Sequence, residues 1–147
     1  MQTGLLHLHG FLPFIFLLLM LVVLVQNFLV WKSDKAFTRS LARQNRIAVV
    51  LAHLQLTIGL IILFVYRRQL ILDMGNLTSN KAIRETYLEH PVIMIIAAVL
   101  ITIGSAKSKR GTTDAEKAKS VVVWFGSALV LIAYAMPWEK FLTRAGA

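Results

Sequence analysis

Four long apolar runs, separated by short polar segments, set the pattern of this chain. None of the runs contains Lys, Arg, Asp or Glu, and they extend over Gly10–Trp31, Ile47–Tyr66, Pro91–Ser105 and Val121–Trp138. A helix needs about 20 apolar residues to cross the hydrocarbon core of a bilayer. Only helices and closed barrels satisfy their backbone groups in lipid, and these runs are too long and continuous for barrel strands. The pattern predicts an all-α protein, an integral membrane four-helix bundle.

We expect residues 1–147 to form one transmembrane domain, with spans at about 8–31, 46–66, 88–106 and 118–138. The first run lacks a basic flank and a small-residue cleavage site, so we expect it to remain in the mature protein. Thr113-Asp-Ala-Glu116 has the pattern of a capping box, which predicts that the fourth helix begins near Asp114, in water.

The segment between the second and third runs is the longest of the connections. Gly75–Asn80 is rich in turn-forming residues, which predicts a break in the chain there. A short helix over Lys81–Glu89 is expected to lead into the third span, with Pro91 at an early or kinked position.

Basic residues are distributed unevenly among the polar segments, and the net charge is +9. The first and third loops hold ten Lys and Arg residues, whereas the opposite side holds six. The positive-inside rule then predicts that these two loops are cytoplasmic and that both termini lie on the outer side. The ten are Lys32, Lys35, Arg39, Arg43, Arg46, Lys107, Lys109, Arg110, Lys117 and Lys119, and the six are Arg67, Arg68, Lys81, Arg84, Lys140 and Arg144.

This basic character is explained by a membrane partner rather than by nucleic acid, for which the chain has no binding pattern. Basic side chains beside a membrane exit attract anionic lipid headgroups. The third loop is therefore the expected lipid-binding segment, and its candidate residues are Lys107, Lys109, Arg110, Lys117 and Lys119.

All four histidines, His7, His9, His53 and His90, lie in or at the ends of the predicted spans. Polar residues inside spans are costly, which makes them candidates for function. In the predicted topology His7, His9 and His90 share the outer level, whereas His53 lies about 20 Å below the outer end of its helix. His7 and His9 lie on nearly opposite helix faces, so only one of them is expected to point into the bundle.

Two polar clusters follow from these positions. The outer cluster is His7 or His9 with Glu89 and His90, near the level of Tyr134. Its imidazoles and carboxylate are suitable ligands for a metal ion, and two of its imidazoles are suitable axial ligands for a haem iron. The inner cluster is Gln26 or Asn27 with His53 and Ser127. The alternative interpretation is that these histidines are packed hydrogen-bond donors between helices.

The chain has no Cys, which excludes disulfides, thiolate metal sites and iron–sulfur clusters. Short segments spread over nearly the whole length carry a resemblance. They are Gly4-Leu-Leu-His7-Leu-His9, Ala52-His53-Leu-Gln55-Leu-Thr-Ile-Gly59-Leu, Glu89-His90-Pro91, Ile103-Gly104-Ser-Ala-Lys107-Ser-Lys109-Arg110 and Pro137-Trp138. In these segments the chain resembles a bacterial family of small four-helix inner-membrane proteins loosely labelled cytochrome b-like. The resemblance implies a multi-pass protein of the bacterial inner (plasma) membrane in which His7, His9, His53 and His90 match the family pattern as candidate ligands of haem b.

Three functions are compatible with the sequence. The first is a haem-binding electron carrier that exchanges electrons with a quinone. The second is a non-catalytic accessory or scaffold subunit of a larger membrane complex, or of a homo-oligomer, since small residues such as Gly59, Ala97 and Ala98 suit helix packing. The third, a transporter or channel, is less favoured because no buried acid–base chain or broken helix is evident. No residue is assigned a catalytic role.

Overall fold

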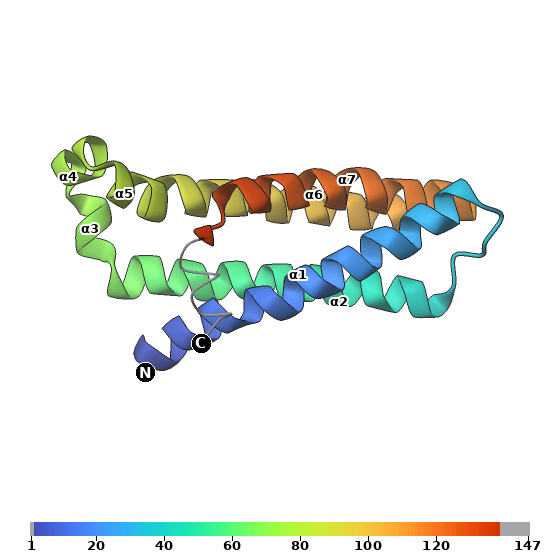
Figure 1. Cartoon of the computed structure of the whole chain (residues 1–147), viewed down its shortest axis with the longest axis horizontal. Helices are drawn as coiled ribbons and strands as arrows, with labels where there is room; N and C mark the ends of the chain where they lie inside the picture. Colours follow the sequence, from blue (N-terminus) through green and yellow to red (C-terminus); the bar gives the residue numbers. More distant parts are fainter. Residues whose placement is uncertain (1, 139–147) are drawn as a thin grey trace.

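The computed structural model describes residues 2–138, and every regular element in that range is helical (Figure 1). The four long helices are α1 (Gln2–Lys32), α2 (Arg39–Ile61), α6 (His90–Arg110) and α7 (Asp114–Ala135). The shorter elements are η1 (Ile62–Tyr66), α3 (Arg68–Leu72), α4 (Met74–Ser79), α5 (Lys81–Arg84) and η2 (Glu85–Glu89), of which η1 and η2 are π-helical turns.

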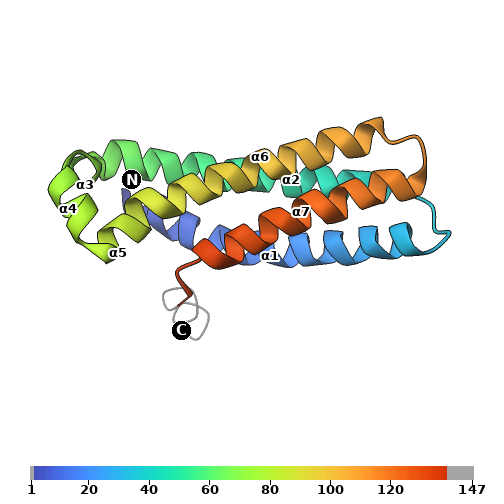
Figure 2. The same ribbon diagram turned by 90° about the horizontal axis from the view of Figure 1, so that it is seen from above.

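The long helices form an up-and-down bundle in which each helix packs against two neighbours. Helix α1 contacts α2 and α7, and α6 contacts the same two helices from the other side (Figure 2). Two short connections, 33–38 and 111–113, lie at one end of the bundle. The start of α1, the small helices α3 to α5 and the end of α7 lie toward the other end (Figure 1). We call these the short-loop end and the cavity end.

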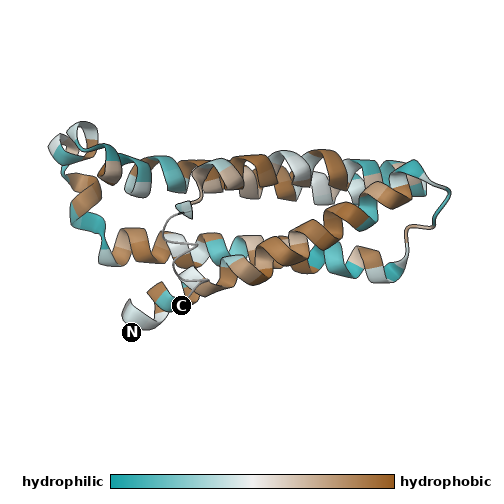
Figure 3. Cartoon of the chain, in the orientation of Figure 1, coloured by the Kyte–Doolittle hydropathy of each residue, from teal (hydrophilic) through white to brown (hydrophobic). Residues whose placement is uncertain are grey.

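Four helical segments are long and apolar enough to cross a membrane, which confirms that each of the four apolar runs forms a long helix. They are Thr3–Lys32, Arg39–Tyr66, Lys81–Arg110 and Asp114–Ala135. Most extend beyond the predicted spans because Lys, Arg and Gln in the flanks are good helix formers. Apolar residues cover the middle of the bundle and polar residues gather at both ends (Figure 3).

The core is formed by apolar side chains from all four long helices. Met20, Val23, Ile101, Val121 and Phe125 are fully buried. By contrast, large apolar residues cover the outside of the bundle, with Leu18 and Val130 among the most exposed. An apolar exterior is expected of helices surrounded by lipid rather than water.

Side-chain caps fix where several helices begin. Thr113 and Glu116 form both bonds of the predicted capping box, and α7 begins at Asp114 as expected. Most of the predicted break over Gly75–Asn80 is instead the short helix α4, and the chain leaves the helical conformation only at Asn80. The reason is Asp73, whose carboxylate accepts a hydrogen bond from the backbone N–H of Asn76 at 3.1 Å. This bond, together with one from the Asn76 side chain, lowers the pKa of Asp73.

Candidate functional site

A cavity of about 610 Å³ lies at the cavity end, between the first half of α1, the second half of α2, the first half of α6 and the end of α7. Its inner walls are apolar, with Phe16, Ala97 and Ile101 among them. Nine polar residues also line it: His9, Gln55, Arg67, Glu85, Thr86, Tyr87, Glu89, His90 and Tyr134. A cavity of this size, with apolar inner walls and a group of polar side chains, is typical of a site for a small molecule or cofactor.

His9 is positioned by a proline one turn further along α1. A helix normally pairs the carbonyl of His9 with the N–H of residue 13, but Pro13 has no N–H. The carbonyl oxygen of His9 instead accepts a hydrogen bond from Nε2 of Gln55 on α2, at 2.9 Å. An unpaired carbonyl is costly in an apolar environment, so this bond fixes α1 against α2 beside the cavity.

The imidazole of His9 packs directly on the backbone of α2 at Gly59. A Cβ atom added to Gly59 would lie 2.9 Å from Cε1 of His9 and 3.6 Å from both ring nitrogens. Real Cβ atoms do not approach other atoms this closely, so any larger residue at position 59 would displace the ring. His9 is half-buried, whereas His7 is exposed, which agrees with the expectation that only one of the pair points inward.

His90 makes a different kind of contact, with the last carbonyl of α7. Its Nδ1 lies 2.9 Å from the carbonyl oxygen of Ala135, the residue at which α7 ends. Because a carbonyl only accepts, Nδ1 must carry a proton, and a neutral ring then has its lone pair on Nε2. Nε2 has no hydrogen-bond partner within residues 2–138. Metal-bound histidines are usually oriented in this way, by a bond from the other ring nitrogen to a carbonyl.

Both flanks of the cavity contain a π-helical turn. In η2 the cause is Pro91, which cannot donate to the carbonyl of Tyr87 and crowds it. The helix widens there, and the N–H of His90 donates to the carbonyl of Glu85. The second turn, η1, ends α2 and contributes Ile62 and Leu63 to the cavity wall. Such turns occur often at functional sites because they re-aim the side chains around them.

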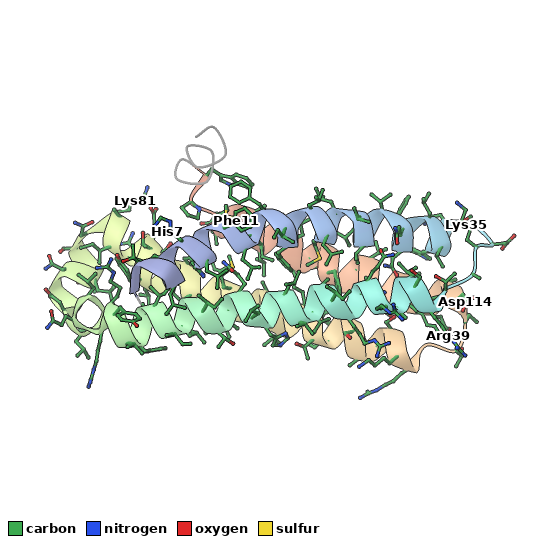
Figure 4. All side chains as sticks on the ribbon, turned by 90° about the horizontal axis from the view of Figure 1, so that it is seen from below. His7, Phe11, Lys35, Arg39, Lys81 and Asp114 are labelled. Carbon is green, nitrogen blue, oxygen red and sulfur yellow. The ribbon has the colours of Figure 1, made fainter. Side chains whose placement is uncertain are left out.

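Of the proposed metal set, His9, Glu89 and His90 line the cavity, whereas His7 does not. His7 is exposed, at the same end of the molecule as Lys81 (Figure 4). Glu89 is paired with Arg84, whose Nε lies 2.9 Å from its Oε1. Within the part of the chain that the structure describes, no three His, Asp or Glu side chains are placed to hold a metal ion together.

His53 lies apart from the cavity, on the outer surface between α2 and α6. Its Nδ1 donates to the carbonyl of Val49 at 2.8 Å, and its Nε2 lies 3.2 Å from Oγ1 of Thr102. The expected inner cluster with Ser127 does not form, because Ser127 is exposed on α7 and donates to its own helix at Val123. Both ring nitrogens of His53 are engaged, so it is not placed as a ligand of the cavity.

The inner polar contact that does form is a pair of amides that sequence reasoning missed. Asn27 on α1 is fully buried, and its Nδ2 donates to Oδ1 of Asn45 on α2 at 2.9 Å. Asn45 donates back to Oδ1 of Asn27 at 3.3 Å. The sequence does indicate Asn27 as a polar residue inside a predicted span. Its partner is missed because the basic residues around Asn45 predict a loop there. Helix α2 begins earlier, at Arg39, because Thr38 caps it.

The five basic residues of the predicted lipid-binding segment divide into different environments. Lys107 lies over the ring of Trp124, at 5.7 Å from its centroid, and Lys119 lies 5.9 Å from the centroid of Trp31. Arg110 is exposed. Lys109 and Lys117 line a pocket at the short-loop end, to which we return below. Two further basic residues of the topology argument, Lys140 and Arg144, lie outside the described residues.

No protein-family model, no curated protein and no solved structure matches this chain.

Proposed function

We propose that this protein is a multi-pass bacterial inner-membrane protein that binds one haem b in the cavity and carries electrons. His9 and His90 are the residues that would hold its iron. The observation that carries the proposal is that both residues line one cavity from different helices, and that His90 is held in the tautomer that ligation needs. The resemblance to cytochrome b-like membrane proteins points in the same direction.

The donor set and the walls of the cavity fit this group. Two imidazoles from facing helices are common ligands of electron-transfer haems, and the apolar lining suits a porphyrin. Arg67 and Tyr87 line the same cavity toward its outer end, where they are suited to bind carboxylate groups. A bound haem would supply one-electron chemistry, which the side chains of this protein do not.

The residues of the chain have separate tasks in this proposal. Gln55 holds the backbone of His9 in place, and Gly59 leaves room for its ring. The carbonyl of Ala135 orients the His90 ring and keeps the proton on Nδ1. Phe16, Ile101 and the other apolar wall residues would exclude water from a bound haem. A dry, apolar environment favours the less charged oxidation state of the iron.

In the proposed orientation, the short-loop end faces the cytoplasm and both chain termini lie on the outer side. Ten of the sixteen Lys and Arg residues lie in or beside the two short loops, which supports this orientation by the positive-inside rule. The cavity then opens at the outer surface of the membrane, within reach of a quinone or a periplasmic partner.

The test is the absorption spectrum of the full chain, expressed with haem supply and purified in mild detergent. The wild type should show a Soret band and sharp bands on reduction. His90→Asn should abolish the low-spin reduced spectrum, because asparagine keeps a donor for the Ala135 carbonyl but cannot ligate iron. If His90→Asn left the spectrum unchanged, His90 would be a structural cap only.

Two exposed histidines serve as matched controls for the ligands. His9→Ala should remove the low-spin spectrum, whereas His7→Ala, two residues away, should leave it intact. His53→Ala should also leave it intact. A spectrum that depends on His53 or His7 and tolerates the loss of His9 would contradict the proposed ligand pair.

A second function, an accessory subunit of a larger complex, is favoured by one observation. His53, Thr57 and Thr102 are exposed polar residues on the outside of the bundle, inside candidate membrane spans. These groups are hydrogen-bonded within the bundle. Polar groups in spans nevertheless usually face protein rather than lipid, so a partner helix that covers this strip would shield them from lipid. Crosslinking from a cysteine at Thr57 in membranes tests this, and no crosslinked product above the monomer would contradict it.

A further inference from the structure

A second pocket, at the opposite end of the bundle from the haem cavity, has the chemistry of an anion site. It has a volume of about 360 Å³ and lies between α2, α6 and the first turns of α7. Three cationic residues line it, one from each helix: Arg46, Lys109 and Lys117. Their convergence is not evident from the sequence, because Arg46 is far from the other two along the chain.

The positive charges at this pocket are only partly balanced. Lys117 lies 3.5 Å from Asp114, but neither Arg46 nor Lys109 forms an ion pair with any residue in the range 2–138. Like charges that are held together repel one another, and an anion between them removes this repulsion. The arrangement therefore favours a bound anion.

Hydroxyl groups complete the lining. Ser105 and Ser108 of α6 both line the pocket, and Ser108 is only 6% exposed. A hydroxyl donor beside converging cations is suited to a phosphate oxygen.

The remaining walls are apolar and continue into the lipid-facing surface. Phe37, Ala42 and Val121 line the pocket, and the exposed apolar residues Ile47 and Val50 follow on α2. A phosphate group in the pocket would thus have apolar helix surface beside it. This combination fits a phospholipid better than a free inorganic ion.

We propose that this pocket binds the headgroup of an anionic phospholipid, with the phosphate between Arg46, Lys109 and Lys117 and the acyl chains along α2. Basic pockets between transmembrane helices are known to hold lipid headgroups in this way. The proposal is independent of the haem site, which lies at the other end of the bundle.

The test is native mass spectrometry of the full chain in detergent, with phosphatidylglycerol added. The triple variant Arg46→Gln, Lys109→Gln, Lys117→Gln should lower lipid retention about a hundredfold, because each cation near a charged headgroup contributes roughly fivefold. Helicity by circular dichroism should stay as in the wild type. Unchanged retention in a folded triple variant would overturn the proposal.

A second triple variant removes the same charge outside the pocket: Lys107→Gln, Arg110→Gln, Lys119→Gln. It should lower retention by less than about twofold, since these residues do not line the pocket. An equal loss in both triple variants would mean that the whole basic surface attracts lipid and that the pocket has no special role.

Two further comparisons in the same experiment identify the chemical class of the ligand. Phosphatidylcholine with the same acyl chains should be retained less than phosphatidylglycerol, and inorganic phosphate at the same concentration should not displace the lipid. Displacement by inorganic phosphate would show a free-anion site and overturn the lipid assignment. Ser108→Ala should weaken retention about two- to fivefold, as expected for one lost hydrogen bond to a charged group.

Discussion

At the scale of single residues, Pro13 and Gln55 show how this chain compensates a broken helix bond. Pro13 leaves the His9 carbonyl without its usual donor, and Gln55 of another helix supplies one at 2.9 Å. Neither residue is informative alone. The pair explains why a polar amide lies inside an apolar run and how the backbone of a proposed ligand is held.

This compensation predicts a coupling between the two positions. Gln55→Leu should lower the free energy of unfolding in detergent by about 1–2 kcal/mol, because it leaves the His9 carbonyl unpaired. In the Pro13→Ala background the N–H of the new alanine bonds to that carbonyl, so the same change should cost less than about 0.5 kcal/mol. Equal costs in both backgrounds would show that Gln55 acts in some other way.

Gly59 is the second residue on which the placement of His9 depends. Gly59→Ala should displace the His9 ring and lower haem retention, even though alanine favours a helix by about 1 kcal/mol. Gly126→Ala is the matched control, because a Cβ atom there would meet nothing within 4 Å. If both variants retained haem equally, the close contact between Gly59 and His9 would have no role in ligation.

At the scale of helices, the Asn27–Asn45 pair fixes how α1 and α2 face each other. Each amide is almost fully buried and bonds to the other, so removing one takes those bonds from its partner. Asn27 keeps only its bond from Nδ2 to the carbonyl of Val23. Asn27→Leu or Asn45→Leu should each lower the free energy of unfolding by about 1–3 kcal/mol, whereas the double variant should recover part of that loss. Thermal unfolding in detergent measures this, and strictly additive losses would argue against a direct pair.

The helices themselves were largely predictable, whereas their contacts were not. Four uncharged runs long enough for a bilayer are a strong signal, and Thr113 with Glu116 marked the start of α7 correctly. The early start of α2 was missed because Arg39, Arg43 and Arg46 looked like a loop, although long basic residues are also good helix formers. Helix α4 was missed because Gly75–Asn80 reads as a turn without its cap, Asp73.

The cavity was predictable only in part. Depth along the helices predicted that His53 lies apart from His9 and His90, and His53 does not line the cavity that contains the other two. The pairing of Glu89 with Arg84 and the contact of His90 with Ala135 depend on three-dimensional packing and on the wide turn before Pro91. Sequence spacing carries little information about such contacts.

At the scale of the whole molecule, the bundle has two chemically different ends. The cavity end holds His9 and His90, and the short-loop end holds the basic pocket. Reporter fusions at residues 40 and 112 should both report the cytoplasm, because the two short loops carry the larger share of basic charge. A periplasmic signal from both positions would invert the proposed orientation.

The central claim is that one chain binds one haem b through His9 and His90. The most direct measurement is the haem content of the purified full chain, determined as its pyridine haemochrome and divided by the protein concentration. We expect about one protohaem per chain for the wild type and much less than one for His90→Asn, which loses a ligand but keeps its bond to Ala135. A wild-type protein that folds in haem-supplied cells and contains no haem would contradict the claim.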